Sequence, residues 1–332
     1  MNVPLWVWAA TILFIVGLLV FDFYAHVKTP HAPSMKESGL WSTFYVGLGL
    51  LFGVGVWIGW DQQHGIEYWA GFLTEKSLSV DNLFVFLIIM TSFRVPREFQ
   101  QKVLLIGIVI ALVMRGIFIA LGATIIENFS WAFYVFGAFL VYTAWKLLGS
   151  NHDEDEEYHE NAFIRLVRRI VPTTQEYVGD RMTVKIDGRR MITPMAIVML
   201  AIGSTDLLFA FDSIPAIFGL TREPYIVFTA NAFALLGLRQ LYFLLGGLLS
   251  RLVYLSIGLA FILAFIGVKL VIHAMHENEV PFINGGEHIT FIPEIPTLVS
   301  LAVIIVTISV TAWLSLLKTR SDERKLVPPV VD

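Results

Sequence analysis

The stretch Glu75-Lys76-Ser77-Leu78-Ser79-Val80-Asp81-Asn82 decides how the chain folds. It lies inside an apolar run from 68 to 92, and about 20 residues at 1.5 Å each are enough to cross a bilayer. Two carboxylates, an ammonium and a carboxamide are costly to place in lipid, and such groups within a span mark functional positions. The stretch therefore predicts a membrane-spanning helix with a polar site along its length.

The composition indicates a polytopic membrane protein. Of the 332 residues, 56% are hydrophobic and 15% are charged, whereas soluble proteins carry about 25% charged residues. The chain has no cysteine, which excludes disulfides and thiolate metal sites and leaves oxygen and imidazole as metal ligands. Nine apolar runs are predicted to be transmembrane helices, at 5–24, 40–60, 68–92, 102–123, 129–149, 193–218, 225–246, 253–273 and 296–317.

Lysine and arginine are distributed unevenly among the predicted connections. With the N-terminus outside, the inside connections hold 17 of the 23 Lys and Arg residues, and the outside connections hold only Arg222. Because cytoplasmic loops are enriched in these residues, the sequence predicts an outside N-terminus and a cytoplasmic C-terminus. The first run has no basic residue before it and no small-residue cleavage pattern after it, so we expect a retained helix and not a signal peptide.

The segment from Glu75 to Lys146 resembles the segment from Asp206 to Lys269. Each begins with an acid, and six positions later it carries a second acid that is followed directly by a polar residue. In both segments a turn with proline comes next, and an arginine lies near the end of the span that follows. The matched residues are Glu75, Asp81 and Asn82 with Asp206, Asp212 and Ser213, and Arg115 with Arg239. Each unit has three spans, so the second unit must cross the membrane in the opposite direction. The chain therefore predicts an all-α fold with an inverted repeat of the third to fifth and sixth to eighth spans, as in many secondary transporters.

The predicted spans divide the chain into six parts. These are two N-terminal spans (1–66), the first repeat (67–149), a cytoplasmic loop (150–192), the second repeat (193–273), an external loop (274–295), and a last span with a cytoplasmic tail (296–332). In the cytoplasmic loop, Asp187-Gly188 between alternating residues predicts a β-hairpin. The histidine and acidic cluster at 152–160 either binds or senses metal or is a solvated loop, and 274–295 is expected to be an ordinary acidic loop.

Depth estimates bring the acids of the two units to one level. At about 1.5 Å per residue, the antiparallel third and sixth spans place Glu75 level with Asp212, and Asp81 level with Asp206. Six positions rotate by about 240° around a helix, so the acids of a pair either line different sides of a cavity or are separated by an unwound turn. Pro215 favours unwinding in the sixth span, because proline has no N–H for the preceding turn.

We expect this layer to bind a hard divalent cation. Four carboxylates at one depth cannot all stay charged in a low dielectric, so protons are the expected counter-ions when a cation binds or leaves. Oxygen ligands of this kind suit Mn²⁺, Mg²⁺ and Ca²⁺ alike. The predicted metal-binding residues are Glu75, Asp81, Asn82, Asp206, Asp212 and Ser213.

Five further polar residues lie close to the layer, and each has two interpretations. Lys76 either compensates the neighbouring carboxylate or points away. Arg115 and Arg239 either pair with the site carboxylates and exchange with the ion, or make snorkelling or interhelical contacts. Asp22 is either a ligand at the inner mouth of the route or an interfacial residue, and Asn231 either reaches the layer or forms an interhelical hydrogen bond.

Two stretches of the sequence resemble the signatures of a known family. E-K-S-L-S-V-D-N at 75–82 and D-L-L-F-A-F-D-S-I-P-A-I at 206–217, with the following N-A-F-A-L-L-G-L-R and Y-F-L-L, are similar to the signature stretches of the TerC family. The nine spans, the outside N-terminus and the basic central loop are most similar to its Alx branch. The resemblance implies Mn²⁺ export across the bacterial inner membrane, with the acidic site residues of the family at the six positions named above. Its links to tellurite resistance, alkaline stress and metal supply for exported enzymes are looser.

The sequence thus favours an exporter of Mn²⁺ that works by alternating access of the two units, with protons as exchanged partners and the lipid bilayer as its surroundings. No cofactor and no nucleic-acid partner are expected. The alternative is a membrane scaffold that assists insertion or metallation of exported proteins and binds membrane-protein partners through 150–192. An enzyme is not expected, because an intramembrane aspartyl protease carries G-x-G-D, whereas Asp206 lies in Gly203-Ser204-Thr205-Asp206 and the acids form two pairs.

Overall fold

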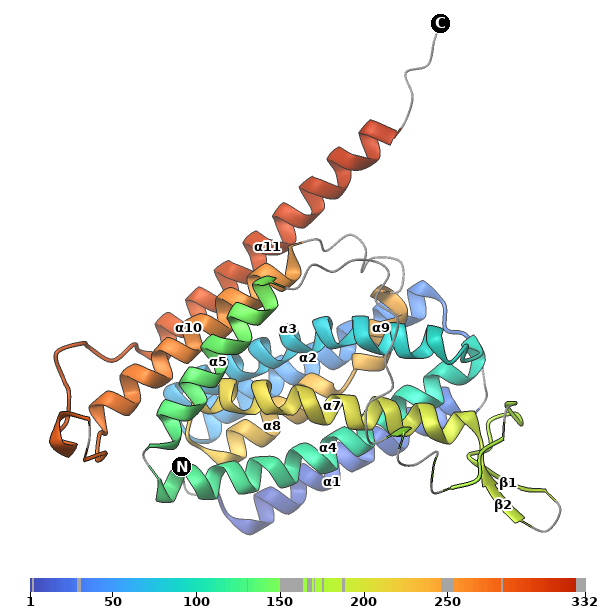
Figure 1. The fold of residues 1–332 in the computed structure, drawn as a ribbon, viewed down its shortest axis with the longest axis horizontal. Coiled ribbons are helices and arrows are strands. Elements are labelled where there is room, and N and C mark those ends of the chain that lie inside the picture. Colours follow the sequence, from blue (N-terminus) through green and yellow to red (C-terminus); the bar gives the residue numbers. More distant parts are fainter. Residues whose placement is uncertain are drawn as a thin grey trace, which may run out of the picture.

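The fold is almost wholly helical (Figure 1). The computed structural model describes residues 1, 3–28, 31–129, 131–149, 164–165, 169, 171–174, 176–186, 189–245, 254–281 and 283–326, without the side chains of 81, 84, 127, 128, 149, 189, 245 and 320–326. Its elements are α1 (Leu5–Asp22), a π-helix (Phe23–Val27), α2 (Met35–Gly59), α3 (Gln62–Ser92), α4 (Arg97–Asn128), α5 (Ala132–Gly149), β1 (Thr183–Ile186), β2 (Arg189–Ile192), α7 (Pro194–Phe218), α8 (Pro224–Leu235), α9 (Leu238–Leu245), α10 (Leu255–His276), a 3₁₀ turn (Asn284–Gly286) and α11 (Thr297–Leu326).

Most of these helices have the length and hydropathy of membrane spans. In the described part of the chain, seven helical stretches are long and apolar enough to cross a membrane, and Ala132–Leu148 is a shorter apolar helix. Helix α3 has 31 residues but is more polar, because it carries the stretch 75–82. The chain is therefore a polytopic, all-α membrane protein, and the total of nine spans stays a prediction.

Local sequence fixes where several helices begin. Ser34 accepts a hydrogen bond from the Glu37 amide at 3.2 Å and the Glu37 carboxylate accepts one in return, which caps α2. Asp61 caps α3 by accepting from the His64 amide at 2.9 Å, and this hydrogen bond holds the pKa of the Asp61 carboxyl below its usual value. Helices α7 and α8 begin at Pro194 and Pro224, where a missing N–H costs nothing.

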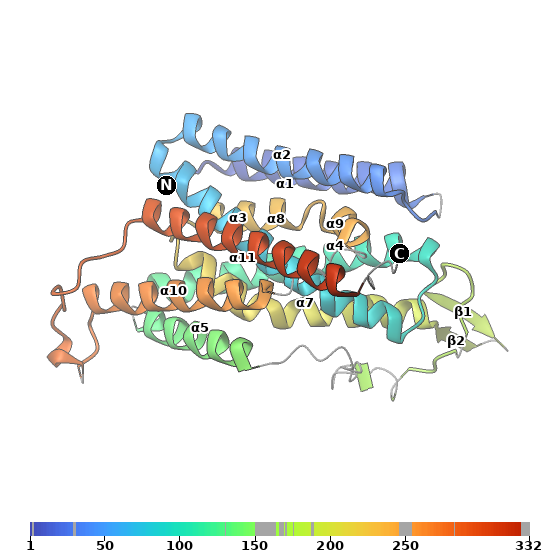
Figure 2. The same cartoon turned by 90° about the horizontal axis from the view of Figure 1, so that it is seen from above.

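Helix α3 lies at the centre of the bundle and packs against α2, α7, α8 and α11. Figure 2 shows α1 and α2 as an outer layer on one side and α5 on the opposite side. The contacts between the two predicted units are reciprocal, because α3 packs on α8 while α4 packs on α7, and α5 packs on α10. At the crossing of α5 and α10, a Cβ on Gly137 would lie 2.7 Å from the Gly267 carbonyl oxygen, and one on Gly267 would lie 2.8 Å from the Gly137 oxygen. Matched contacts of this kind are expected if a two-fold axis relates the two predicted units.

The predicted seventh span, 225–246, is broken into two helices. Helix α8 ends at Leu235, and α9 begins at Leu238. Between them Gly237 has a φ of 79°, a conformation in which side chains other than glycine are strained. A Cβ at this position would also lie 2.7 Å from the Cβ of Tyr45 on α2. The break therefore depends on glycine both for its backbone conformation and for the close approach of α2.

The predicted unwinding of the sixth span near Pro215 is wrong. Helix α7 is continuous from Pro194 to Phe218, with Pro215 inside its last turn. The proline leaves the Phe211 carbonyl without its helical N–H, but such a loss is tolerated in membrane helices that neighbouring helices support, and α7 continues across it. Because the helix is regular, Asp206 and Asp212 face different sides of it: Asp206 is 1% exposed, whereas Asp212 is half-buried.

The predicted β-hairpin of the central loop is confirmed. Strands β1 and β2 are antiparallel, and Ile186 pairs with Arg189 across the turn. The hydroxyl of Tyr177, which precedes β1, donates to the Phe93 carbonyl oxygen at 2.9 Å and so attaches the loop to the end of α3. The turn residues 187–188 and the acidic cluster at 152–160 lie outside the described residues.

Candidate functional site

Arg115 is the centre of a buried ionic cluster formed by three helices. It lies on α4 and is 1% exposed. Its Nε and Nη2 atoms donate to the two carboxylate oxygens of Asp206 on α7, at 2.9 and 3.1 Å. Its Nη1 atom donates to the carboxylate of Glu75 on α3 and, at 3.2 Å, to the hydroxyl of Ser213. Because a bidentate pair has a fixed direction, the cluster sets the relative positions of α3, α4 and α7.

The cluster contains more negative than positive charge. Among the described side chains, Arg115 is the guanidinium that Glu75 and Asp206 share. The hydroxyl of Ser79 lies 3.4 Å from Oε1 of Glu75, whereas the buried Oε2 has no hydrogen-bond partner there. Burying a carboxylate oxygen without a partner is costly. The cluster therefore attracts cations and offers an oxygen that is free to bind one.

Lys76 follows Glu75 directly in the sequence but is engaged elsewhere. Its Nζ donates to the carbonyl oxygens of Ala234 at 2.9 Å and Leu236 at 3.3 Å. These carbonyls lie at the break between α8 and α9, where no continuing helix supplies an N–H. Of the two possibilities predicted for Lys76, the structure shows the second, in which it points away from the carboxylate and caps the open end of α8.

The other predicted residues have different environments. Asp212 is half-buried and faces another side of α7 from Asp206. Asn82 on α3 is buried. Asn231 on α8 is 1% exposed, and within the described chain neither its amide nitrogen nor its oxygen has a hydrogen-bond partner, so the predicted interhelical hydrogen bond is wrong. The side chain of Asp81 lies outside the described part of α3.

Arg115 stands where the carboxylates would have to converge on a metal ion. In the part of the chain that the structure describes, no group of three or more His, Asp or Glu side chains is arranged to hold a metal ion. The depth estimate set Glu75 level with Asp212, whereas in the structure Glu75 shares Arg115 with Asp206. An ion that binds both carboxylates must displace the guanidinium. The geometry thus fits an exchange between the arginine and a cation.

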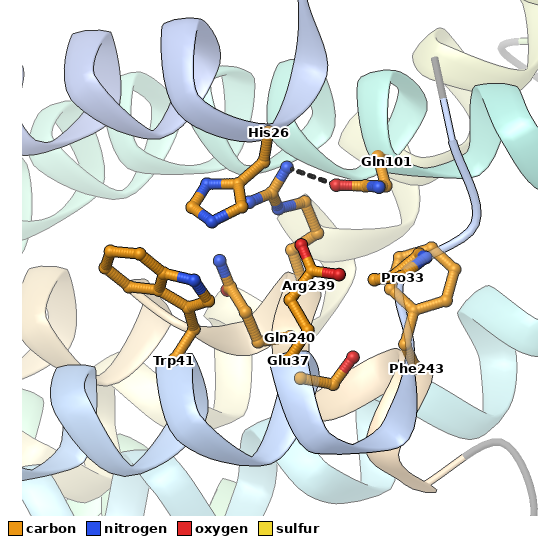
Figure 3. Close-up of a pocket in the computed structure, with 9 residues that line it drawn as sticks. His26, Pro33, Glu37, Trp41, Gln101, Arg239, Gln240 and Phe243 are labelled. Atoms are coloured by element: carbon orange, nitrogen blue, oxygen red, sulfur yellow. Dashed lines mark hydrogen bonds between the residues drawn. The ribbon is translucent and has the colours of Figure 1, made fainter. Parts of the chain in front are cut away.

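A second buried cluster is centred on Asp22, at the end of α1. Its Oδ1 accepts hydrogen bonds from Arg239 at 2.7 Å, from Gln240 at 3.0 Å and from Tyr45 at 3.1 Å. Arg239 also donates to Gln101 at 2.9 Å, as Figure 3 shows. Arg239 therefore pairs with Asp22 and not with the predicted site carboxylates. Asp22 is 5% exposed and is already paired with Arg239, and its role as a ligand or as an interfacial residue stays a prediction.

The sequence pointed to the two charges of this second cluster but not to its neutral members. Tyr45, Gln101 and Gln240 are uncharged residues in or beside apolar runs, where such residues are common in membrane proteins. The available signal was Gln240, which directly follows Arg239. An arginine within an apolar run faces the bundle interior and needs a partner there, so its neighbours in the sequence are candidates for the same network.

A cavity of about 970 Å³ opens at the end of the molecule that carries the N-terminus. Glu67 on α3 is one of its lining residues and is 7% exposed. The carboxylate of Glu67 accepts a hydrogen bond from the Thr221 hydroxyl at 2.5 Å. Glu67 precedes Glu75 by eight residues, or about 12 Å along α3. Glu67 was not among the predicted site residues, although this carboxylate directly precedes the same apolar run.

The apolar floor of this cavity separates it from the Arg115 cluster. Gly71 lies between Glu67 and Glu75 on α3, and a Cβ there would lie 3.1 Å from Ile217 and 3.3 Å from Ala230. Helices α3, α7 and α8 are thus in close contact just below the cavity. In this conformation the cavity and the cluster are separate.

Comparison with known proteins gives a consistent result. A family model described as "Integral membrane protein TerC family" matches residues 60–323. The "Uncharacterized membrane protein Rv2723" of Mycobacterium tuberculosis is 50% identical over 314 residues, which are 92% of this chain and 79% of that protein. The "Putative membrane-bound redox modulator Alx" of Escherichia coli is 39% identical over 73% of this chain and 78% of its own. No solved structure matches at a comparable significance.

Proposed function

Since the chain belongs to the TerC family of integral membrane proteins, we propose that it exports a divalent metal ion, Mn²⁺ foremost, from the cytoplasm of a bacterium. The observation that carries the proposal is the Arg115 cluster. Two buried carboxylates, Glu75 and Asp206, hold one guanidinium, and one carboxylate oxygen is unpartnered. A cluster with this charge is stabilised by a cation that arrives from either side.

The ligand chemistry supports a hard divalent cation as the cargo. The side chains of the cluster supply carboxylate and hydroxyl oxygens, and the chain has no thiolate to offer. When the ion binds Glu75 and Asp206, Arg115 swings away, and when the ion leaves, Arg115 returns. Arg115 thereby lowers the net charge of the empty site while the protein changes between its two access states. Protons are the counter-ions on the remaining carboxylates.

The cavity at the N-terminal end supports the direction of transport. It lies on the side where the amino group of Met1 pairs with Glu223, the side that the distribution of Lys and Arg predicts to be outside. An ion released from the cluster would leave through this cavity once the contact at Gly71 separates. The two three-helix units would open and close this contact by moving against one another, as in other transporters with inverted repeats.

Metal uptake into inside-out vesicles tests the proposal. We expect Asp206→Asn and Asp212→Ala each to lower the initial rate of Mn²⁺ uptake at least about tenfold, the effect of losing ~1.4 kcal/mol of ion binding. Asp180→Asn is the matched control, because Asp180 is a carboxylate near the hairpin that pairs with Lys102 outside the cluster. Uptake by either cluster variant at the rate of the parent, with equal amounts of inserted protein, would refute the proposed site.

A scaffold function is the second candidate, favoured by the β1–β2 hairpin. This hairpin carries exposed basic side chains, Lys185 and Arg190, and is attached to the end of α3. Its surface suits an acidic segment of a membrane-protein partner. Replacing both basic residues with glutamine should abolish partner binding and leave Mn²⁺ uptake unchanged if the scaffold function exists. If uptake falls as well, the hairpin belongs to the transporter.

A further inference from the structure

A small cavity lies within the Asp22 cluster, at the end of the molecule opposite the large cavity. It is lined by residues of the π-helix, α2, α4 and α9 and by Pro33, and its volume is about 10 Å³. Figure 3 shows the side chains of His26, Trp41, Gln101, Arg239 and Gln240 around it. A volume of this size is about the smallest that holds one water molecule.

Three buried polar atoms of residues that line this cavity have no hydrogen-bond partner in the described chain. They are Oγ of Ser38, Nε of Arg239 and Oε1 of Gln240, and these residues are at most 5% exposed. Nδ1 of His26, which also lines the cavity, lies 3.2 Å from Oδ1 of Asp22. An unpaired polar group is costly to bury, so three of them around one small space indicate an occupant.

The chemistry of these atoms identifies the occupant. Nε–H of Arg239 needs an acceptor, which excludes a metal ion or an ammonium ion. The amide nitrogen of Gln240 donates to Asp22, so its Oε1 is fixed as an acceptor that needs a donor. An anion has no proton to donate and would lie beside the carboxylate of Asp22. A neutral molecule that both accepts and donates, of the size of water, satisfies every partner.

We propose that this cavity binds one water molecule, and that the network it completes is the closed inner gate of the transport route. The gate rests on the proposed transport function, whereas the water site stands without it. The network joins four separate elements: α1 with its π-helix through Asp22 and His26, α2 through Tyr45, α4 through Gln101, and α9 through Arg239 and Gln240.

The position of the network fits a gate. Gln101 precedes Arg115 by 14 residues on α4, so the network lies about 21 Å along the helix from the Arg115 cluster. The cluster thus lies between a cavity of about 970 Å³ at the outer end and one of about 10 Å³ at the inner end. The π-helix that presents His26 adds a local feature, because wide turns of this kind occur mostly at functional sites. The inner end therefore carries a buried hydrogen-bonded network, whereas the outer end carries the large cavity.

Thiol labelling tests the gate, because the chain contains no natural cysteine. Ser42 is 7% exposed and lies one turn beyond Ser38 on α2, so Ser42→Cys reports access past the cavity. In inside-out vesicles, a membrane-impermeant maleimide should label Ser42→Cys at least about tenfold more slowly than Lys185→Cys on the exposed hairpin. Adding Asp22→Asn, which removes the acceptor charge that Arg239 needs, should raise the rate of Ser42→Cys labelling by about the same factor.

Two further variants separate opening of the gate from general unfolding. Glu67→Gln removes a buried, hydrogen-bonded carboxylate at the outer cavity and should leave the labelling of Ser42→Cys unchanged. Tyr45→Phe removes one hydrogen bond to Asp22 and keeps the packing, so it should raise the labelling rate less than Asp22→Asn does. If Asp22→Asn does not fold, Tyr45→Phe alone decides. Equal labelling of Ser42→Cys with and without the second change would overturn the gate.

The labelling result is independent of the proposed transport function. If the parent protein moves no Mn²⁺ but Asp22→Asn still exposes Ser42→Cys, the transport proposal fails and the closed network stands. If the parent moves Mn²⁺ and labelling does not respond, the gate alone fails. For the water site, a high-resolution density map of the parent protein should show one peak within hydrogen-bond distance of Arg239 Nε and Gln240 Oε1. A dry cavity or a metal ion there would overturn the water site.

Discussion

Arg115 and Arg239 occupy corresponding places in the two predicted three-helix units, yet they differ in the charge around them. Arg115 is shared by two carboxylates, Glu75 and Asp206, and one carboxylate oxygen has no partner. Arg239 faces one carboxylate, Asp22, which two neutral side chains also donate to. The first cluster carries an excess of negative charge, whereas the second is balanced.

This difference is the reason for proposing cation binding at one cluster and a structural contact at the other. A balanced buried pair is not stabilised by an additional cation and is costly to separate. Two carboxylates with a single guanidinium carry a net charge of about −1, and a divalent cation in place of the arginine would bring that charge to zero. The count of charges around each arginine is therefore why we propose transport at Arg115 and closure at Arg239.

The largest effect is expected for Arg115→Met. Two buried carboxylates would be left without a counter-charge, which costs about 3–5 kcal/mol. Thermal unfolding of the purified protein in detergent should show this loss, and Mn²⁺ should restore part of it by binding the exposed carboxylates. A variant as stable as the parent, or one that Mn²⁺ does not stabilise, would show that the two clusters do not differ in charge.

Arg239→Met should have a smaller effect, because Asp22 keeps its hydrogen bonds from Tyr45 and Gln240. We expect a loss of about 2 kcal/mol, the contribution of a hydrogen bond to a charged group. Addition of Mn²⁺ should not restore this loss, since a single carboxylate among neutral donors is a poor site for a divalent ion. If Mn²⁺ restored as much stability to Arg239→Met as to Arg115→Met, the two clusters would not differ in their binding of the cation.

Gly237→Ala tests the backbone that brings Tyr45 to the second cluster. The φ of 79° and the approach of 2.7 Å to the Tyr45 Cβ both oppose a side chain, and the backbone strain alone is worth about 1–2 kcal/mol. Gly55→Ala on α2 is the control, because a Cβ there meets nothing within 4 Å. The same unfolding measurement should show a loss for Gly237→Ala only. Similar stability of the two variants would mean that the break tolerates a side chain.

The smallest effect is expected at an exposed ion pair, Lys102 with Asp180, which are 24% and 46% exposed. The hydrogen bond from Lys102 holds the pKa of Asp180 below its usual value. A lowered pKa stabilises the folded state above the unfolded pKa of about 4, and the contribution is lost as the pH falls through the folded value. Lys102→Met should therefore cost less than about 1 kcal/mol at pH 7, and the cost should shrink as the pH falls below about 4. A cost that does not change with pH would arise from packing and not from charge.

The sequence located the first cluster because its residues are conspicuous in an apolar chain. Glu75, Asp206 and Ser213 were predicted as site residues from their position in membrane spans, and Arg115 was predicted as a possible partner. The structure places these four in contact. The hairpin was likewise predictable, because Asp-Gly between alternating residues encodes a two-residue turn.

The break at Gly237 and the pairing of Asp22 with Arg239 could not be predicted from local sequence. A single glycine is common in membrane helices, and its positive φ here follows from the approach of Tyr45 and from the hydrogen bonds of Lys76. Asp22 and Arg239 are 217 residues apart, so only the packing of α1 against the second unit brings them together. The course of α7 at Pro215 could not be predicted either, because the neighbouring helices decide whether a helix bends or continues at a proline.

The break between α8 and α9 has a mechanical consequence. Lys76 fastens α8 to α3, whereas the hydrogen bonds of Asp22 fasten α9 to α1. The two halves of one span are thus held by different hydrogen bonds and are joined by the backbone torsions of Gly237. Helix α9 has eight residues, or a length of about 12 Å, so a torsion of about 10° would move its far end by about 2 Å. If the inner gate opens as proposed, Gly237 is the position at which a small change of backbone torsion would displace α9 without displacing α8.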